Sequence, residues 1–465
     1  MNRPVDTVEH VLAPKRACLP DVWLWLLAAM LVVLTLAIPS SFRAWGDVGY
    51  MALALATGLV AVTATVVVER MSAGRALWLI IAVAVVLRGV LLFSEPLLST
   101  DIYRYVWDGR VQAAGINPYR YFPADEALRS LRDTEIFPHI NRADYAVTIY
   151  PPVAQMFFLA VTRVGETVTV MKLGLLACEG VTVTFLFLLL RRVGRPVTRL
   201  VAYLWHPLPL WEIANSGHVD ALMIALLTVG LWFGLTGRPL QGANSIALGA
   251  LAKPVAVLAL PVLWRPWDWK LPLIVMATVM VCYLPYLSVG WGVFGFLTQG
   301  YVTEEGLNSG DRIWPLAAWR WIFGALQWDL AGYFAVGILS IAGLAFHAAF
   351  RSQRLTARQL ADINNLLLAY LFVVSPNYPW YFLVATPFVV LVGGAPVWAM
   401  TLGAVFLQRE AEWTQLLPQF LLVPEFVRKS MLYGAFLAAC AYWLWHSRFD
   451  EPHAANPRSD TLGPH

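Results

Sequence analysis

The stretch STDIYRYVWDGRVQAAGINPYRY, residues 99–121, follows an apolar run at residues 76–92 and is dense in acids, arginines and aromatic side chains. As a helix it would begin at a cap formed by Ser99 or Thr100, because these residue types cap helix starts, and it would end at Gly115. A change this abrupt, from apolar to mixed polar and aromatic residues, indicates that the chain leaves a membrane here. The rest of the fold is organised around this exit.

One face of this predicted helix carries polar groups at offsets of four, seven and eleven residues, namely Asp101, Tyr105, Asp108 and Gln112. Asp101 and Asp108 would lie about two turns apart, roughly 10 Å along the axis. That separation is too great for two carboxylates to share a proton, and it suits one general base and one separate substrate contact. The pattern fits equally well an amphipathic helix at the membrane surface, with its aromatic residues at headgroup level.

The composition indicates a membrane protein. Of the 465 residues, 59% are hydrophobic and 13% are charged, and the mean hydropathy is +0.63. Soluble domains do not have this balance. We assign the net charge of +4 to cytoplasmic loops, which are rich in lysine and arginine, and expect no nucleic-acid partner. The four scattered cysteines predict neither a disulfide framework nor a metal cluster.

Apolar runs, oriented by the lysines and arginines of short loops, predict an all-α polytopic membrane protein with about 12 crossings and both termini in the cytoplasm. The predicted spans are residues 22–39, 48–69, 76–94, 167–190, 198–213, 219–236, 271–288, 330–350, 359–374, 381–394, 396–408 and 428–446. A long outer loop is predicted at residues 95–150. Residues 153–162 are too few to cross, so we expect a helix at the outer interface.

One apolar segment does not fit this alternation. Residues 240–263 contain Lys253-Pro254 at their centre and end on Arg265 and Lys270. If this segment crossed the membrane, its basic end would lie outside and every later loop would be inverted. Two half-helices that enter from the cytoplasm and turn at Lys253-Pro254 remove the conflict, and we therefore predict a re-entrant pair.

Six short strings spread over residues 76–394 together resemble the membrane glycosyltransferases of the GT-C superfamily, on the branch that uses polyprenyl-phosphate sugars such as mannose. The strings are DIYRYVWDGR, NPY, IYPP, GHVD, KP and PWY. The resemblance implies a GT-C-like bundle with its catalytic membrane core at residues 76–394. A cytoplasmic tail and two added spans at residues 1–75 would precede that core. Further spans at residues 395–447 and a cytoplasmic tail at residues 448–465 would follow it.

The resemblance also implies residue roles. An acid early in the first outer loop is the catalytic base of such enzymes, and the matching residue is Asp101. The implied substrate contacts are Tyr103, Arg104, Tyr105, Asp108, Arg110, Tyr150, Glu212, His218, Asp220, Lys253, Tyr378, Trp380 and Tyr381. The implied partners are a lipid-linked sugar donor, a glycan or glycolipid acceptor and membrane lipids. The enzyme would act in the cell envelope, in the plasma (inner) membrane, with its active site on the extracytoplasmic or periplasmic side.

A phosphate leaves readily as an anion, so sugar transfer from such a donor needs no general acid. It needs a base for the acceptor hydroxyl and cations for the charge that grows on the phosphate. Asp101 fits the first need, and Lys253, Arg104 or Arg110 fit the second. A single displacement would invert the anomeric centre. No cofactor is expected, and the first outer loop lacks a D-x-D pair at the position where some relatives carry one, which argues against metal dependence.

Several of these residues also admit structural roles. Lys253 could form an ion pair with Glu179 or Asp220, and residues 212–220 could be a polar turn with a His–Asp hydrogen bond. Residues 378–381 could belong to an interfacial aromatic belt. We expect Glu304, Glu305 and Asp311 to be solvated loop acids.

Another class of function also fits the membrane charges. A transporter or flippase of a lipid-linked sugar would account for charged residues and re-entrant helices in the membrane. Transporters often show inverted repeats, however, and the sequence shows none. Such a protein would also have no need for the acid-rich helix at Asp101.

Overall fold

The structure, a computed structural model, describes residues 19–351, 356–408 and 424–449. Within these ranges the chain forms helices joined by loops, without a β-strand, and the predicted all-α class is confirmed. Residues 1–18, and residues 450–465 of the cytoplasmic tail predicted at 448–465, lie outside the described residues.

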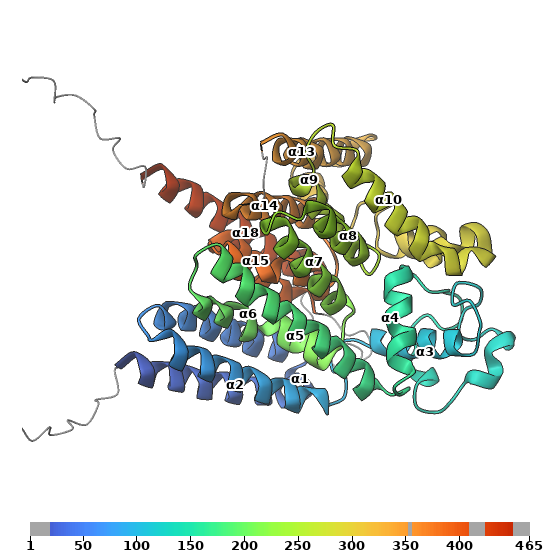
Figure 1. Ribbon diagram of the computed structural model, residues 1–465, viewed down its shortest axis with the longest axis horizontal. Coiled ribbons are helices and arrows are strands. Elements are labelled where there is room, and N and C mark those ends of the chain that lie inside the picture. The colour runs from blue at the N-terminus through green and yellow to red at the C-terminus, as the bar shows by residue number, and fades with distance from the viewer. Residues whose placement is uncertain (1–18, 352–355, 409–423, 450–465) are drawn as a thin grey trace, which may run out of the picture.

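The longer helices follow the predicted spans closely. The α-helices, labelled as in Figure 1, are α1 (Leu19–Val68), α2 (Ala73–Leu92), α3 (Asp101–Ala113), α4 (Pro152–Thr162), α5 (Val168–Arg192), α6 (Val201–Leu204), α7 (Asp220–Leu235), α8 (Pro239–Ala250), α9 (Leu260–Leu263), α10 (Lys270–Tyr283), α11 (Val302–Glu304), α12 (Trp314–Phe323), α13 (Asp329–Arg351), α14 (Ala357–Val374), α15 (Thr386–Leu391), α16 (Ala395–Gly403) and α18 (Glu425–Phe449). The 3-10 and π turns are η1 (Glu126–Leu131), η2 (Phe137–His139), η3 (Val197–Leu200), η4 (Pro209–Asn215), η5 (Pro254–Ala259), η6 (Leu284–Phe294), η7 (Leu297–Tyr301), η8 (Pro379–Ala385) and η9 (Ala404–Leu407).

Among the described residues, five helices are long and apolar enough to cross a membrane, and a sixth span is present if η4 and α7, bent by 117°, form one. The five are α1, α2, α5, α10 continued through η6, and α13. Other predicted spans correspond to shorter apolar helices, such as η8 with α15 and α16 with η9. The number of crossings, about 12, therefore stays a prediction.

Helix α1 holds the first two predicted spans and reverses between them. Gly46 has φ 58° and ψ −142°, a region that is open essentially only to glycine. Asp21, at the start of α1, pairs with Arg75, at the start of α2, at 2.6 Å. Because α2 begins soon after α1 ends, this contact brings the two ends of α1 together. Its halves are therefore antiparallel.

The predicted re-entrant segment is a pair of helical pieces that contact each other. Helix α8 ends at Ala250, and η5 and α9 return along it after a turn at residues 251–253. Helix α8 also packs against α7 and α10. A turn at Lys253-Pro254 is thus present, and entry of this pair into a membrane from the cytoplasm stays a prediction.

The loop predicted to lie outside, residues 95–150, gathers at one end of the molecule. In Figure 1, α3 and α4 and the loop between them lie at the right, whereas the start of α1 and the end of α18 lie at the left. Helices α1, α2 and α5 run side by side below, with α7 and α8 above them. At the α3 end, Gln408 donates to the carbonyl of Leu98, and Arg428 of α18 pairs with Asp47 at 3.0 Å. The C-terminal part of the chain thus holds both α3 and the α1 reversal.

Candidate active site at the start of α3

A cavity of about 340 Å³ lies beside the first turn of α3. Its walls come from six separate parts of the chain. They are residues 98–101, 104, 105, 141, 142, 146–150, 218, 253, 296, 301, 305, 378, 380 and 381. The cavity joins Asp101 to Lys253, and this juxtaposition is the one that the predicted chemistry requires.

Asp101 is held by donors from two other segments. Its backbone amide donates to Ser99 Oγ at 3.2 Å, and the N-cap residue of α3, Thr100, makes no side-chain capping bond. Its Oδ1 accepts from Asn141 Nδ2 at 2.8 Å, and its Oδ2 accepts from the Tyr150 hydroxyl at 3.4 Å. Burial and the charge of Asp101 raise the pKa of Tyr150, so that hydroxyl stays protonated and donates.

Helix α4 connects the Asp101 side of the cavity to the Lys253 side. Tyr150 directly precedes the two prolines that open α4, and prolines suit a helix start because they lack an amide proton. The first free amide of the helix, that of Val153, donates to the carbonyl of Leu251 at 3.0 Å. Since Leu251 lies two residues before Lys253, this bond fixes Tyr150 relative to the turn that carries the lysine.

Lys253 has a carboxylate partner and still reaches the cavity. Its Nζ lies 2.6 Å from Asp220 Oδ2 and 4.5 Å from the centroid of the Tyr381 ring. The ion pair with Asp220, one of the structural alternatives, is therefore present. Glu179 pairs instead with Arg88, at 2.7 Å. Lys253 is the more exposed member of its own pair and lines the cavity, whereas Asp220 is buried behind it.

The GHVD string positions three neighbours of the cavity. Gly217 has φ 72°, and a Cβ there would lie 2.3 Å from Ile102 Cδ1, so glycine lets α3 pack closely. His218 lines the cavity, and its Nε2 lies 3.2 Å from the buried Glu212. Asp220 pairs with Lys253. Glu212 and Asp220 thus stand behind the wall rather than on it.

Aromatic rings form the wall next to Lys253. Trp380 stacks on His218, with ring centroids 4.2 Å apart, and on Tyr378, at 4.5 Å. Tyr381 lies under the Lys253 ammonium and contacts the hydroxyl of Tyr301. Trp380 therefore lies between His218 and Tyr378 in a stack of protein rings. A sugar could stack only on a ring at the edge of this stack.

Of the four predicted contacts Tyr103, Arg104, Tyr105 and Asp108 on α3, the structure brings Arg104 and Tyr105 to the cavity wall and leaves the other two away from it. Arg104 lines the cavity, but its Nε is engaged by the buried Asp108 at 2.8 Å. Asp108 also accepts from Gln155 at 2.8 Å and does not line the cavity. The Tyr103 ring contacts the His139 ring at a tilt of 32°, with centroids 4.7 Å apart, outside the cavity. Tyr105 does line it.

Arg110 faces the loop instead of the cavity. It pairs with Asp133 at 2.6 Å and with Glu166 at 2.7 Å. Burial acts to raise the pKa of Asp133, but hydrogen bonds from Arg110 and from the amides of Ile136 and Phe137 lower it to about 2. Arg110 therefore orders the loop that follows α3, and among the predicted phosphate-binding cations Lys253 and Arg104 are the ones that line the cavity.

The wall includes residues that the sequence-based prediction of the site lacks, among them Asn141, Arg142 and Glu305. Asn141 binds Asp101, and Arg142, with φ 53°, lines the cavity while its Nε lies 2.6 Å from Glu304. Glu305 is 7% exposed and lines the cavity, so the expectation of a solvated acid is wrong for it. No spacing signal marks these residues, because their partners are distant in sequence.

A metal would need several ligands close together. Among the described residues there is no group of three or more His, Cys, Asp or Glu side chains that could hold an ion. The positive charges on the cavity wall come from Arg104, Arg142 and Lys253.

Comparison with known proteins places the chain in a family. The alpha-(1->6)-mannopyranosyltransferase N-terminal domain matches residues 25–268, which contain Asp101 and Lys253. The chain belongs to this family. The predicted resemblance to mannosyltransferases is thereby confirmed. No solved structure matches the chain.

Curated relatives are similar to part of the chain. Alpha-(1->6)-mannopyranosyltransferase A of Mycobacterium tuberculosis is 28% identical over 239 residues, 50% of this chain and 43% of that protein. The enzyme of the same name from Corynebacterium glutamicum is 28% identical over 37% of this chain and 36% of that protein. A probable alpha-(1->6)-mannopyranosyltransferase of Mycolicibacterium smegmatis is 24% identical over 55% of this chain and 42% of that protein. The chain spans less than half the length of each of these relatives.

Proposed function

We propose that this protein transfers a mannosyl residue from a polyprenyl-phosphate donor to a hydroxyl of a glycan or glycolipid acceptor, with inversion at the anomeric carbon. The observation that carries this proposal is the cavity of about 340 Å³ that Asp101 and Lys253 both line. Membership of the mannopyranosyltransferase family supports the choice of mannose.

The proposed reaction is a single displacement. An oxygen of Asp101 takes the proton of the acceptor hydroxyl, and the acceptor oxygen forms a bond to the anomeric carbon. The bond from that carbon to the phosphate oxygen breaks, and its electron pair leaves with the phosphate. Lys253, supported by Arg104, faces the growing negative charge.

The surroundings of Asp101 suit a general base. Each of its oxygens accepts one hydrogen bond, from Asn141 and from Tyr150 respectively. A carboxylate has about four acceptor positions, so room remains for an acceptor hydroxyl. The two donors also fix the carboxylate, which lowers the cost of orienting it for reaction.

We further propose that the cavity faces the extracytoplasmic side of the plasma (inner) membrane, with both termini cytoplasmic and about 12 crossings. The α8 and η5–α9 pair would then be re-entrant, with Lys253 at its tip next to the lipid-borne phosphate. The position of α3 and α4, opposite the start of α1 and the end of α18, supports this topology (Figure 1).

Positive side chains on the wall could supply the charge that a metal supplies elsewhere. We therefore expect transfer to continue in the presence of a chelator. Loss of transfer with EDTA, restored by Mg²⁺ or Mn²⁺, would contradict a metal-free reaction.

A donor panel tests the proposed function. The purified protein in lipid vesicles would be supplied with polyprenyl-phosphate mannose, glucose and arabinose and with a mannoside acceptor. We expect transfer from the mannose donor, and an anomeric configuration in the product opposite to that of the donor. Absence of transfer from every donor, together with movement of donor lipid between leaflets, would favour a flippase.

A further inference from the structure

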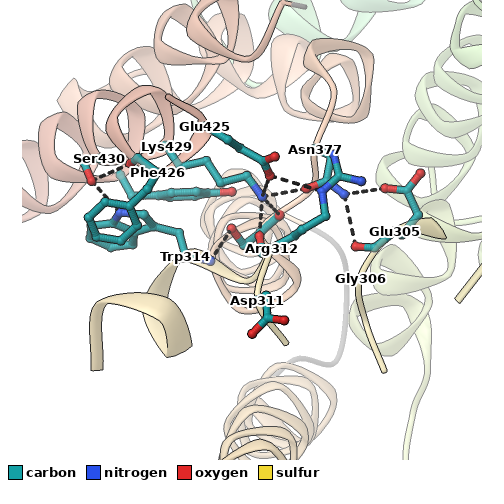
Figure 2. Close-up of polar contacts among 12 residues, drawn as sticks. Glu305, Gly306, Asp311, Arg312, Trp314, Asn377, Glu425, Phe426, Lys429 and Ser430 are labelled. Carbon is teal, nitrogen blue, oxygen red and sulfur yellow. Dashed lines mark hydrogen bonds and ion pairs between the residues drawn. The ribbon is translucent and has the colours of Figure 1, made fainter. Parts of the chain in front are cut away.

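A polar network at the start of α18 extends to Glu305, which lines the cavity (Figure 2). At its centre is Lys429, whose side chain is 2% exposed. Its ammonium donates to Asn377 Oδ1 at 2.6 Å, to the carbonyl of Ser375 at 3.1 Å and to the carbonyl of Arg312, and it lies 3.4 Å from Glu425. A buried ammonium is stable only with such partners, so the position of Lys429 is strongly constrained.

This lysine also holds the end of α14. Ser375 follows α14 with φ 49°, an unusual conformation for a residue with a side chain. Lys429 binds its carbonyl, where the helix dipole favours a cation, and Ser375 Oγ accepts from the amide of Trp314 at 3.0 Å. The turn that leads from α14 to Asn377 is therefore fixed by α18.

Asn377 connects Lys429 to Glu305 on the cavity wall. Its Oδ1 faces Lys429, and its Nδ2 donates to Glu305 Oε2 at 2.5 Å and to the Glu305 carbonyl at 3.2 Å (Figure 2). An amide has distinct donor and acceptor ends, so binding the lysine with the oxygen directs the NH₂ group to the carboxylate. Glu305 is the residue of this network that lines the cavity.

The wall around Glu305 suits a sugar. It contains the phenol of Tyr378 and the guanidinium of Arg142 as well as the carboxylate. Burial raises the pKa of Glu305, and the hydrogen bond from Asn377 and the charge of Arg312 offset only part of that rise. A carboxylate that accepts from a fixed amide at one oxygen can accept hydroxyl protons with its remaining lone pairs.

We propose that Glu305 binds ring hydroxyls of a sugar substrate, and that Lys429 is a positioning residue that holds Glu305 in place through Asn377. This inference rests on the proposed function. The three residues lie beyond residue 268, where the family match ends, so the role comes from the geometry of this chain and not from the family.

The ligand chemistry, a sugar hydroxyl, belongs to both the donor mannose and the acceptor glycan. Steady-state kinetics with each substrate varied in turn separate the two, because only the substrate that Glu305 contacts should show a higher KM. Glu305→Gln should raise that KM about tenfold, as expected for the loss of a charged hydrogen-bond partner, and should change kcat much less.

Two variants test the positioning role. Asn377→Ala breaks the bridge and leaves the Lys429–Glu425 pair intact, and Lys429→Met removes the anchor. Each should raise the same KM as Glu305→Gln. The double variant Glu305→Gln/Lys429→Met should match Glu305→Gln alone, because the lysine acts through the glutamate. If Lys429→Met does not fold, Asn377→Ala and the corresponding double variant with Glu305→Gln decide the question.

The matched control is Ser430→Ala, on the same turn of α18. Ser430 accepts from Trp314 Nε1 at 2.8 Å and has no bond to Asn377 or Glu305. The Ser430→Ala variant should leave the KM values for the donor and for the acceptor unchanged. Unchanged KM values in Glu305→Gln, or effects of Glu305 and Lys429 that multiply, would overturn the inference. Those results, with normal mannose transfer by the wild-type protein, would leave the proposed function standing.

Discussion

The carboxylate of Asp101 and the ammonium of Lys253 line the same cavity but have different kinds of partner. Asp101 is held by neutral donors, Asn141 and Tyr150, which leave its charge available. Lys253 is held by a buried carboxylate, Asp220, that offsets part of its charge. The pair with Asp220 keeps the lysine at the wall, so the structural and the proposed functional roles of Lys253 are compatible.

Stability and donor binding can be separated at this lysine. Lys253→Met leaves Asp220 buried without a partner, so the free energy of unfolding should fall by about 3 kcal/mol, as measured by thermal unfolding in detergent. The double variant Lys253→Met/Asp220→Asn removes both charges and should recover much of that stability. The KM for the lipid donor should stay about tenfold or more above that of the wild type in both variants. A normal donor KM in the double variant would mean that Lys253 is purely structural.

The Arg110–Asp133 contact makes a prediction about pH. The pKa of Asp133 is lowered from an ordinary value of 3.8 to about 2 in the folded protein. Its stabilising contribution is therefore fully present above the unfolded pKa and is lost only as the pH falls toward the folded pKa. Asp133→Asn should lower the unfolding temperature by the same amount at about pH 7 and about pH 5. A difference that vanishes by about pH 5 would contradict this assignment.

At the scale of helices, the crossing of α3 over α4 sets the geometry of the cavity. Gly109, in the WDGR string, lies where these helices meet, and a Cβ there would be 2.6 Å from the carbonyl oxygen of Phe158 and 2.5 Å from Thr162 Cγ2. The glycine is needed for close approach and not for an unusual φ. The string therefore has a packing role in addition to its resemblance to a family motif.

Gly109→Ala should force α3 and α4 apart. We expect a loss of about 1–3 kcal/mol in the free energy of unfolding and a lower transfer rate, because Asp101 lies on α3 and Tyr150 is held just before the start of α4. Gly89→Ala, in α2, is the control, since a Cβ there meets no atom within 4 Å. Equal behaviour of the two variants would show that the crossing tolerates a methyl group.

Local patterns predict the helices well, because helical periodicity and apolar length are properties of short segments. Helix α3 begins at Asp101 and ends before Gly115 as expected, and the short apolar helix at residues 153–162 is α4. The same patterns misplace Asp108. Its spacing of four residues from Arg104 is that of an intrahelical ion pair, and the structure contains this pair.

At the scale of the whole molecule, the wall of the cavity depends on contacts that no local pattern records. Glu305 is buried because Asn377, 72 residues away, binds it, and Asn377 is in turn oriented by Lys429. Arg142 reaches the cavity because its backbone is in the left-handed region, at φ 53°. An arginine in the sequence does not predict this conformation. The motif residues could be predicted from the sequence. The distant residues that hold them in place could not.

Helix α18, near the C-terminus, contacts parts of the chain that lie near the cavity. Residues 395–447 are predicted as spans outside the catalytic core, and this division stays a prediction. The contacts of α18 nevertheless reach the α1 reversal at Asp47 and the cavity wall at Glu305, through Arg428 and Lys429. Truncation before α18 should therefore reduce transfer as well as stability, as measured in vesicles with matched amounts of protein.

The most direct test concerns Asp101 as the base. Mannosyl transfer and donor-lipid binding would be measured for the wild type, for Asp101→Asn and for Asp144→Asn, a control that makes the same change at an exposed acid of the same loop. We predict that Asp101→Asn lowers the transfer rate by about 10²–10⁴-fold with donor binding retained, and that Asp144→Asn behaves as the wild type. Normal turnover by Asp101→Asn would contradict the account.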